Sequence, residues 1–578
     1  MVTFEKLPPP DSKLLNKPPP RCQVLIVGCG PSGLFAALLL AKFNVRSVII
    51  ERRGQRTGQP KAHALNPRTL EIFRQAGLDT AKIRKLAASP EDTFWVRCLS
   101  VLTGFEIGKL QYERQDEKVR EYTPEPLLNI SQPIVEDIIQ DAAMETRLVS
   151  LHRRWEWRGN IFDAEGRPVS EVINRDGDGE KTEIISDYII GADGSDSAVR
   201  SFTKELTWDQ LPGHSPKRTY YVSIHARGSL REDMERLQRP AQLYFIMHPR
   251  NPCGLIAYDL SSSWVYAGPV NPTTDPVESF TETRCRELID HCLGPHAKVD
   301  YKLASVNIWA TDPRVASSFA DSTCRVFLVG DAAHSFPPQG GLGINTGIAD
   351  VHNLVWKLGL IIHGQALNPK KLLSSYSLER KPVATSNALQ SFVNEANWNE
   401  MRTCVDEIFA SFNGQDEKMV EEAFHKPDVV AKISHLLDLN KPHFNSLGLQ
   451  LGYLYGSGDQ VELSKDCSVY IPSGNIGARL PHADIRDGKS TLDLLPLRQF
   501  TLFKHKNSHF GESTYDLNGC KVDVKSVIYE DMFVSNEWKN IVGLGEAHRG
   551  GLLVRPDGHI LAHVSSREDV ATALKKYL

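Results

Sequence analysis

The chain has 578 residues, 41% of them hydrophobic and 24% charged, and its formal net charge at pH 7 is −4. One hydrophobic core does not support this length, so we expect about two to four domains. The charge balance excludes the broad basic surface of nucleic-acid-binding proteins, and no apolar run reaches the roughly 18 residues of a membrane span. Segment 1–20 is polar and proline-rich without the apolar core of a signal peptide, which predicts a cytoplasmic protein. The ten cysteines include no C-x-x-C pair, so we expect neither a zinc site nor a dithiol motif.

The first strong motif follows an apolar strand at 24–27, where Gly28, Gly30 and Gly33 have the spacing G-x-G-x-x-G. In dinucleotide-binding units these glycines make a tight turn, admit a pyrophosphate and let a helix pack closely on the strand. The helix expected over 32–43 directs its N-terminal amides at the phosphates. A second apolar run ends in Glu51, at the spacing of about 20 residues where an acid meets a ribose hydroxyl. The alternative is a plain βαβ unit, and this acid favours the dinucleotide.

A polar loop rich in arginine and histidine follows, and it leads into a helix expected over 68–76. The loop lies close in sequence to the phosphate-binding unit. It either reaches the cofactor or forms a solvated connection, and its residues alone do not decide between the two.

The middle of the chain alternates short strands with polar turns, at 94–107 and 149–190, around a helix expected over 134–147. The last of these strands runs into Gly-Ala-Asp-Gly at 191–194, which repeats the logic of the first motif and predicts a return to the same sheet. Residues 212–310 read as a β-rich insertion, with strands near 220–227, 242–248, 254–260 and 263–269. A short polar turn separates the last two, which predicts an antiparallel pair.

A second strong stretch begins with a buried strand that ends in Gly330-Asp331. A loop with prolines and glycines follows, and a helix is expected to run from it to about residue 363. Proline stiffens such a loop while glycine opens its backbone, so amides at the helix start can face a ligand. Helices are expected to continue to about residue 437. From 477 the character changes to mixed strands, a hairpin around 551–562 and a last helix, which we interpret as a separate C-terminal α/β domain.

These three stretches, in this order, resemble the group A flavoprotein monooxygenases, the FAD-dependent aromatic hydroxylases. Residues 191–194 with Arg200 are similar to the family's DG motif, and residues 329–334 are similar to its GD motif. The resemblance covers nearly the whole chain and is greatest to the phenol hydroxylase and dichlorophenol hydroxylase branch. It implies an α/β fold with a Rossmann-type FAD-binding domain, an inserted β-rich substrate domain like that of p-hydroxybenzoate hydroxylase, and a thioredoxin-like C-terminal domain, which residues 553–559 resemble.

The expected domains are a proline-rich arm at 1–20, a discontinuous FAD-binding domain at 21–210 and 311–400 that includes part of the substrate region, and a substrate domain at 211–310. A helical connection at 401–475 and the thioredoxin-like domain at 476–578 complete the chain. Because the last domain lacks a C-x-x-C pair, we expect it to serve packing or homodimer formation rather than redox chemistry.

The resemblance also implies site residues for FAD. Gly28, Gly30, Gly33 and Glu51 would hold the ADP part with Arg52 nearby, Gln132 matches a position that contacts the flavin nucleotide, and Asp331 would bind the ribityl or pyrophosphate portion. The loop from Pro338 to Asn345 would face the isoalloxazine ring, where a helix N-terminus would stabilise reduced flavin by about 1 kcal/mol or more. The full set of expected cofactor-binding residues is Gly28, Gly30, Pro31, Ser32, Gly33, Glu51, Arg52, Gln132, Asp193, Asp331, Pro338, Gly341, Gly343, Ile344 and Asn345.

The reaction that the resemblance implies uses NADH or NADPH to reduce FAD, after which O2 gives a flavin C4a-hydroperoxide that hydroxylates an electron-rich ring. A phenol with a pKa near 10 costs about 4 kcal/mol to ionise at pH 7, so a positioned base matters. Phenol hydroxylases carry an aspartate where this chain has His63, which either acts as the base or lines the flavin pocket. Arg250 and Tyr258 resemble the arginine and tyrosine pair of phenol hydroxylase, with Tyr258 binding a substrate hydroxyl or serving as an ordinary strand aromatic.

The expected function is hydroxylation of a phenolic or polyketide-type aromatic substrate, with no nucleic acid partner. Baeyer-Villiger oxygenation or epoxidation on the same scaffold, and a flavin-dependent reductase or dehydrogenase, stay open as alternatives.

Overall fold

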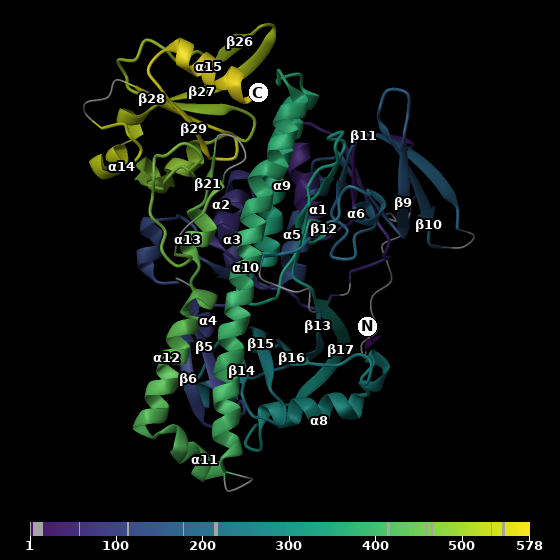
Figure 1. The fold of residues 1–578 in the computed structure, drawn as a ribbon, viewed down its shortest axis with the longest axis vertical. Helices are drawn as coiled ribbons and strands as arrows, with labels where there is room; N and C mark the ends of the chain where they lie inside the picture. Colours follow the sequence, from purple (N-terminus) through teal and green to yellow (C-terminus); the bar gives the residue numbers. More distant parts are fainter. Residues whose placement is uncertain are drawn as a thin grey trace.

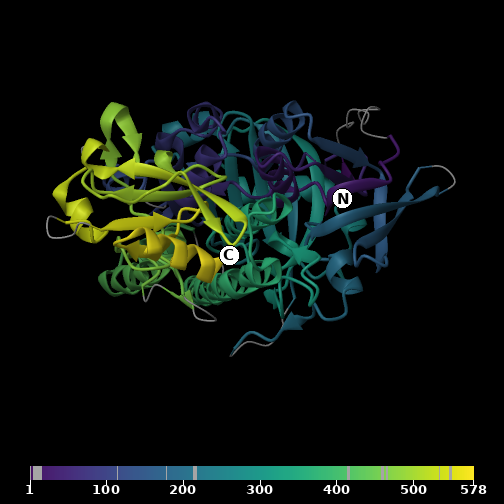
Figure 2. The same ribbon diagram turned by 90° about the horizontal axis from the view of Figure 1, so that it is seen from above.

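The computed structural model describes residues 2–3, 16–56, 58–112, 115–176, 179–212, 218–412, 417–456, 461–463, 466–532, 534–545 and 550–578. Three large sheets organise these residues, and the long helix α10 (Pro369–Ala410) runs beside all three regions of the molecule (Figure 1). The C-terminal sheet and the hairpin of β9 (Trp155–Phe162) and β10 (Pro168–Asn174) lie on opposite sides of the molecule in both views (Figures 1 and 2). No helix in the described ranges is long and apolar enough to cross a membrane.

The first sheet holds the nucleotide motif and has seven strands in the order β8-β3-β2-β11-β10-β9, with β19 also paired to β11. The pairs β8·β3, β3·β2, β2·β11 and β11·β19 are parallel, so the three sequence motifs return to one sheet as predicted. Helix α1 packs between α5 and α9. The elements are β2 (Arg21–Val27), α1 (Pro31–Lys42), β3 (Ser47–Glu51), α5 (Gln132–Glu145), β8 (Val149–Arg153), β9 (Trp155–Phe162), β10 (Pro168–Asn174), β11 (Lys181–Gly191), α6 (Ala198–Phe202), β19 (Val326–Leu328) and α9 (Leu342–Ile362).

The second sheet has eight mostly antiparallel strands in the order β1-β17-β13-β16-β15-β14-β5-β6. The predicted antiparallel pair at 254–260 and 263–269 is confirmed as β15·β16. Strands β5 and β6 come from residues 95–111, so this sheet draws on chain outside the 211–310 insertion. Its elements are β1 (Val2–Thr3), β5 (Trp95–Leu99), β6 (Glu106–Gln111), β13 (Thr219–Gly228), α7 (Arg231–Arg236), β14 (Leu243–Ile246), β15 (Cys253–Asp259), β16 (Ser263–Pro269), α8 (Glu282–Leu293) and β17 (Tyr301–Thr311).

A helical arm links this sheet to the rest. Helix α10 has 42 residues, which makes it roughly 60 Å long, and its Pro382 lies inside the helix. The domain boundary expected at residue 400 therefore falls within a helix, because no stop signal interrupts the chain there. Helix α12 packs against both α10 and β6. The arm continues through α11 (Glu417–Phe424), α12 (Pro427–Phe444) and α13 (Leu447–Leu451).

The C-terminal sheet has the order β26-β27-β25-β28-β29. Its central strand β25 is parallel to β27 and antiparallel to β28, and β28·β29 is the predicted hairpin. This mixed sheet with a terminal helix agrees with the thioredoxin-like arrangement that the resemblance implies. The elements are β25 (Phe500–Lys504), β26 (Thr514–Leu517), β27 (Cys520–Ile528), α14 (Asn536–Ile541), β28 (Gly551–Val554), β29 (Ile560–Val564) and α15 (Arg567–Tyr577).

A buried ionic cluster fastens the C-terminal domain to the arm and to α9. Arg555 donates from both terminal nitrogens to the two carboxylate oxygens of Glu379 on α10, at 2.7 and 2.9 Å. Lys357 on α9 donates to the same carboxylate at 2.9 Å. These cations hold the pKa of Glu379 well below its usual range despite its burial. The cluster therefore braces the helix that begins at the 338–345 loop.

Candidate active site

In the first glycine turn, close packing requires glycine at two of the three motif positions but not at the third. A Cβ on Gly28, whose φ is +108°, would lie 2.3 Å from the carbonyl oxygen of Ala192, and one on Gly33 would lie 2.1 Å from that of Gly28. A Cβ on Gly30 would meet nothing within 4 Å. The close packing thus explains Gly28 and Gly33, while Gly30 presents bare backbone toward open space, as the approach of a phosphate requires.

The N-terminus of α1 is suited to an anion. Pro31 occupies the first turn, Gly30 is the N-cap, and no side chain within the described chain caps this end or places an acid in its first turn. No acid within the helix itself therefore offsets the positive end of its dipole. Ser32 is closely packed: its hydroxyl lies 2.5 and 2.6 Å from the positions that a Cβ would take on Gly330 and Gly347. It packs between the first motif, the GD motif and α9.

Glu51 lies at the end of β3, beside this turn. Its carboxylate accepts hydrogen bonds from the backbone N–H of Cys29 at 3.0 Å and of Arg53 at 2.8 Å. Arg52 is exposed between them. The acid is thus held in one orientation at the edge of the site, as a ribose ligand requires.

The side chains of the DG motif form hydrogen bonds within the protein, and these include the carboxylate of Asp193. Asp193 accepts from the backbone N–H of Ala198 at 2.6 Å and of Val199 at 3.2 Å, and so caps α6. Arg200 donates to the carbonyl of Ala332 at 2.7 Å and lies over the ring of Trp208 at 3.7 Å from its centroid. The motif therefore ties β11 to the GD turn.

The GD turn presents Asp331 next to the start of α9. Its side chain is exposed, yet the surrounding protein displaces enough water to raise the pKa of its carboxyl, against the opposing charge of Lys61. Behind it, buried His334 lies 2.6 Å from a carboxylate oxygen of Asp350, which also accepts from Arg380 at 2.8 Å. Asp350 in turn holds Gly330 N–H at 3.3 Å, so this cluster supports the turn from inside.

The loop from Pro338 to Asn345 delivers a second uncapped helix end. Gly341, with φ +62°, is the N-cap of α9, and no side chain in the described structure caps this end. Gly343 and Ile344 in the first turn are half-buried, and Pro338 is exposed. Asn345 anchors the loop, because its side-chain nitrogen donates hydrogen bonds to the carbonyls of Ala64 (3.0 Å) and Gly341 (2.7 Å).

The carbonyl oxygen of the Asn345 amide accepts from the backbone of Asn66 at 2.9 Å and from the hydroxyl of Thr69 at 2.7 Å. All its hydrogen-bonding capacity is used within the protein. Asn345 therefore holds the loop against the β4 strand (Ala64–Leu65) and the helix α2 (Pro67–Gln75).

Gln132 performs a similar function on the other side of the 61–64 segment. Its backbone N–H donates to the carbonyl of Ala62 at 3.0 Å, and its side-chain oxygen accepts from the N–H of Ala62 at 3.2 Å. The side-chain nitrogen donates to Glu136 at 2.7 Å. This residue thus positions the chain next to His63.

The structure brings His63 and Tyr258 together and adds Tyr112, which the sequence did not single out. His63 Nε2 lies 3.0 Å from the hydroxyl of Tyr112, and the Tyr258 ring stands edge-on to the imidazole with centroids 5.8 Å apart. The Tyr258 hydroxyl donates to the carbonyl of Lys61. Although His63 is only half-buried, the loss of surrounding water lowers its pKa to about 4, so the ring is neutral at pH 7.

Arg250 is not part of this group. It lies on the exposed turn between β14 and β15, whereas Tyr258 lies near the other end of β15, roughly 20 Å away along an extended strand. The sequence spacing suggested a pair, but residues at opposite ends of one strand do not meet at one site.

An aromatic cluster from the helical arm completes the surroundings. The ring of Tyr112 lies 5.9 Å from that of Phe444 on α12, and Phe245 on β14 lies 3.9 Å from Trp398 on α10. Phe245 and Phe444 are also in contact, at 6.3 Å between centroids. No sequence motif marks these residues, since they come from four separate segments.

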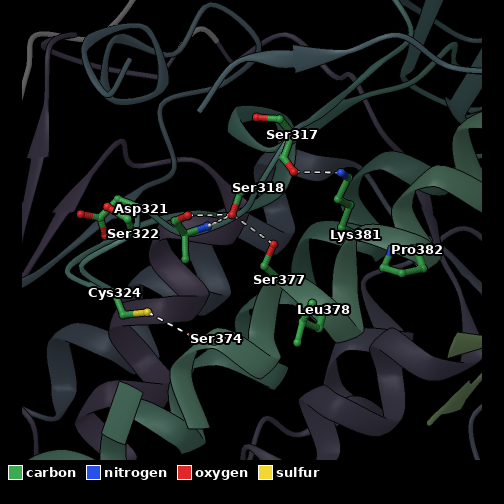
Figure 3. Close-up of a pocket in the computed structure, with 11 residues that line it drawn as sticks. Ser317, Ser318, Asp321, Ser322, Cys324, Ser374, Ser377, Leu378, Lys381 and Pro382 are labelled. Carbon is green, nitrogen blue, oxygen red and sulfur yellow. Dashed lines mark hydrogen bonds between the residues drawn. The ribbon is translucent and has the colours of Figure 1, made fainter. Parts of the chain in front are cut away.

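A hollow of about 410 Å³ lies elsewhere, at the opposite end of β19 from the GD turn (Figure 3). Its polar side chains bind one another and the nearby backbone: Lys381 donates to the carbonyl of Ser317 at 2.8 Å, and the Cys324 sulfur lies 3.5 Å from the Ser374 hydroxyl. The motifs described above do not reach it.

The residues present fit FAD. Two uncapped helix ends, the open backbone at Gly30 and the oriented acid Glu51 meet the needs of phosphates, a ribose and an anionic ring. The acid at the GD turn, Asp331, is within reach of the same helix end.

Comparison with known proteins agrees with this geometry. Residues 21–391 match the family described as FAD binding domain, so the chain belongs to it. The chain is 30% identical to tetracenomycin B2 monooxygenase-dioxygenase of Streptomyces olivaceus, over 93% of this chain and 94% of that protein. It is 27% identical to 2,4-dichlorophenol 6-monooxygenase of Cupriavidus pinatubonensis, over 96% of both. The crystal structure of the flavin-dependent monooxygenase PieE with FAD and substrate superposes with a TM-score of 0.83 at 26% identity, covering 96% of this chain and 98% of that one.

These findings identify the chain as an FAD-dependent monooxygenase. They confirm the predicted family, the fold class and the cofactor. The expected site residues and domain boundaries remain predictions.

Proposed function

We propose that this protein uses NADH or NADPH and O2 to hydroxylate a phenolic ring, with polyketide-derived phenols within its range. The proposal is supported by one observation above the rest: the loop at 338–345, which starts α9 at the GD turn, is fastened by Asn345 to the segment that carries His63. The relatives include enzymes named for 2,4-dichlorophenol and for tetracenomycin B2. These names support an aromatic substrate here, either a simple phenol or a larger molecule.

Bound FAD supplies the chemistry that couples NAD(P)H oxidation to the activation of O2. The chain's own residues bind and orient the reactants. The α1 end and Glu51 hold the ADP part, Asp331 and the α9 end face the remainder of the cofactor, and the positive end of α9 stabilises negative charge there by about 1 kcal/mol. The aromatic cluster around Phe245 and Phe444 limits the access of water.

His63 is the group we assign to the substrate hydroxyl. Its ring is neutral at pH 7, and complete transfer of a proton from a phenol of pKa about 10 to an imidazole of pKa about 4 would cost roughly 8 kcal/mol. His63 therefore accepts a hydrogen bond from the hydroxyl in the ground state. It takes the proton only when the attacked ring makes that hydroxyl much more acidic.

The test is aerobic NADH and NADPH oxidation by the FAD-loaded protein, with simple phenols and larger phenolic polyketides as substrates and with product masses recorded. A gain of one oxygen atom, coupled to substrate-stimulated NAD(P)H oxidation, is the expected result. Turnover that proceeds anaerobically with an organic electron acceptor, and yields no oxygenated product in air, would replace the proposal with a reductase.

A further inference from the structure

The segment that carries His63 is held on both sides of the residue. Before it, the Gln59 side chain donates to the carbonyl of Ser223 on β13 at 3.3 Å, and the Tyr258 hydroxyl on β15 donates to the carbonyl of Lys61. After it, the strand β4 pairs with β7 (Leu128–Asn129). The carbonyl of His63 itself accepts from Ile130 at 2.8 Å. The backbone therefore fixes where the imidazole stands, between the second sheet and the FAD-binding domain.

The two ring nitrogens of His63 have different surroundings. Nε2 lies 3.0 Å from the Tyr112 hydroxyl, while Nδ1 is buried and has no hydrogen-bond partner among the described residues. A neutral imidazole carries one donor and one acceptor nitrogen, and the partner of one nitrogen decides the role of the other. An unpartnered buried nitrogen costs free energy unless a ligand completes it.

We infer that Tyr112 is a positioning residue for the hydroxylation: its oxygen accepts the Nε2–H of His63, which leaves the Nδ1 lone pair to receive the hydroxyl proton of the substrate. This inference rests on the proposed function. Tyr258 donates to the carbonyl of Lys61, which lies two residues before His63. It therefore sets the position of the His63 ring rather than binding the substrate hydroxyl.

The step balances without a further reagent. As the oxygen atom derived from O2 bonds to the ring carbon, its O–O bond breaks and the departing oxygen keeps that electron pair. At the same time the substrate O–H bond breaks, its electron pair forms the C=O bond of a dienone, and an Nδ1–H bond forms on His63. When the ring regains aromaticity, the hydrogen on the attacked carbon leaves as a proton that the departed oxygen takes up, the C–H electron pair returns to the ring, and the proton on Nδ1 returns to the carbonyl oxygen. The developing imidazolium keeps its Nε2–H bonded to the Tyr112 oxygen, which is how the tyrosine stabilises the transition state.

The other titratable groups beside the ring do not replace this role. Burial raises the pKa of Tyr258 above its usual value, so it stays protonated, and Lys61 is exposed. Phe444, which packs on Tyr112, is apolar.

Steady-state hydroxylation by the FAD-loaded full chain tests the inference, with a phenol that the wild type converts. Tyr112→Phe is expected to lower the product-forming kcat about tenfold while KM changes less than about threefold, the size of one lost charge-assisted hydrogen bond. The deficit should shrink as the pH approaches the phenol pKa, because ionised substrate needs no base. Tyr244→Phe is the matched control, because it removes a hydroxyl of the second sheet that donates to the carbonyl of Arg239 at 3.0 Å.

A double-mutant cycle separates positioning from general loss of structure. Asparagine at position 63 keeps a polar atom near Nδ1 but does not reach Tyr112, so His63→Asn and Tyr112→Phe should be non-additive. Equal kinetics and pH profiles for Tyr112→Phe and wild type, or fully additive effects in the cycle, would overturn the inference. If the wild type itself gives no oxygenated product, the proposed function fails instead, and the two failures are distinguishable.

Discussion

Replacing Gly30 and Gly33 by alanine in separate variants should separate cofactor binding from folding. In the structure a Cβ on Gly30 meets no protein atom within 4 Å, whereas a Cβ on Gly33 lies 2.1 Å from the carbonyl oxygen of Gly28. Gly30→Ala therefore costs the apoprotein only the weaker N-cap, about 1 kcal/mol or less. Its methyl group occupies the space that a pyrophosphate needs, so we expect FAD affinity to fall at least about tenfold, or 1.4 kcal/mol.

Gly33→Ala should behave differently. The overlap with backbone forces α1 away from β2, which costs about 1–3 kcal/mol or more of stability as in other overpacked sites. Fluorescence titration of the apoprotein with FAD measures the first effect, and urea unfolding of the apoprotein measures the second. Gly254→Ala is the control, because its Cβ would come no closer than 3.9 Å to any atom and β15 lies in the other sheet. Wild-type FAD affinity in Gly30→Ala would refute the reasoning that places the phosphates at this turn.

Four further substitutions and one change of pH have distinct expected outcomes. Arg250→Ala should leave kcat and KM for a phenol within about twofold of wild type, since substitutions of exposed residues rarely have large effects. Tyr258→Phe should lower kcat. A large loss of activity in Arg250→Ala would contradict the conclusion that Arg250 lies apart from the group around His63. Asn345→Leu should weaken FAD binding and lower the urea midpoint, because four hydrogen bonds that fasten the loop disappear. Arg555→Met should destabilise the protein by about 3–5 kcal/mol, measured by urea unfolding, by leaving a buried carboxylate with one cation fewer. The pKa of Glu379 is lower in the folded state than in the unfolded state, so its ionised carboxylate stabilises the fold above the unfolded pKa near 4.5. This contribution to the free energy of unfolding should be lost progressively as the pH falls below that value. A free energy of unfolding that stays constant from pH 6 to about 3 would contradict this sign.

The nucleotide half of the site was predictable because its chemistry is local. The glycine turn, the acid Glu51 and the Gly330-Asp331 turn each lie within a short stretch, and spacing along the chain reports their geometry directly. Hydrophobic patterns placed the strands that carry them to within a few residues. Asp193 shows the limit of this reasoning, since it lies in a predicted motif but its carboxylate accepts hydrogen bonds from the backbone at the start of α6.

The substrate half was not predictable in the same way. Tyr112, Phe245, Trp398 and Phe444 meet only because α10 and α12 fold back onto the second sheet, and no local pattern encodes that contact. The apparent pairing of Arg250 with Tyr258 failed for the opposite reason. A spacing of eight residues is short in sequence but long in space when the intervening chain is an extended strand.

The helices of the insertion were also missed. Helix α8 buries Cys285, Ile289, Cys292 and Leu293, which recur at helical spacing, but lies between strands in a region that reads as β-rich. Helix α8 has few apolar residues, so its helical repeat is a weaker signal than the alternation of apolar and polar residues in the strands around it.

The central claim is that this monooxygenase places one oxygen atom from O2 on a phenolic ring. The most direct measurement is turnover with NAD(P)H under O2 labelled with the heavy isotope, followed by mass spectrometry of the product from each phenol. The expected product carries one labelled oxygen atom on the ring, in proportion to the NAD(P)H consumed. Hydrogen peroxide as the only labelled product, across simple phenols and phenolic polyketides alike, would contradict it.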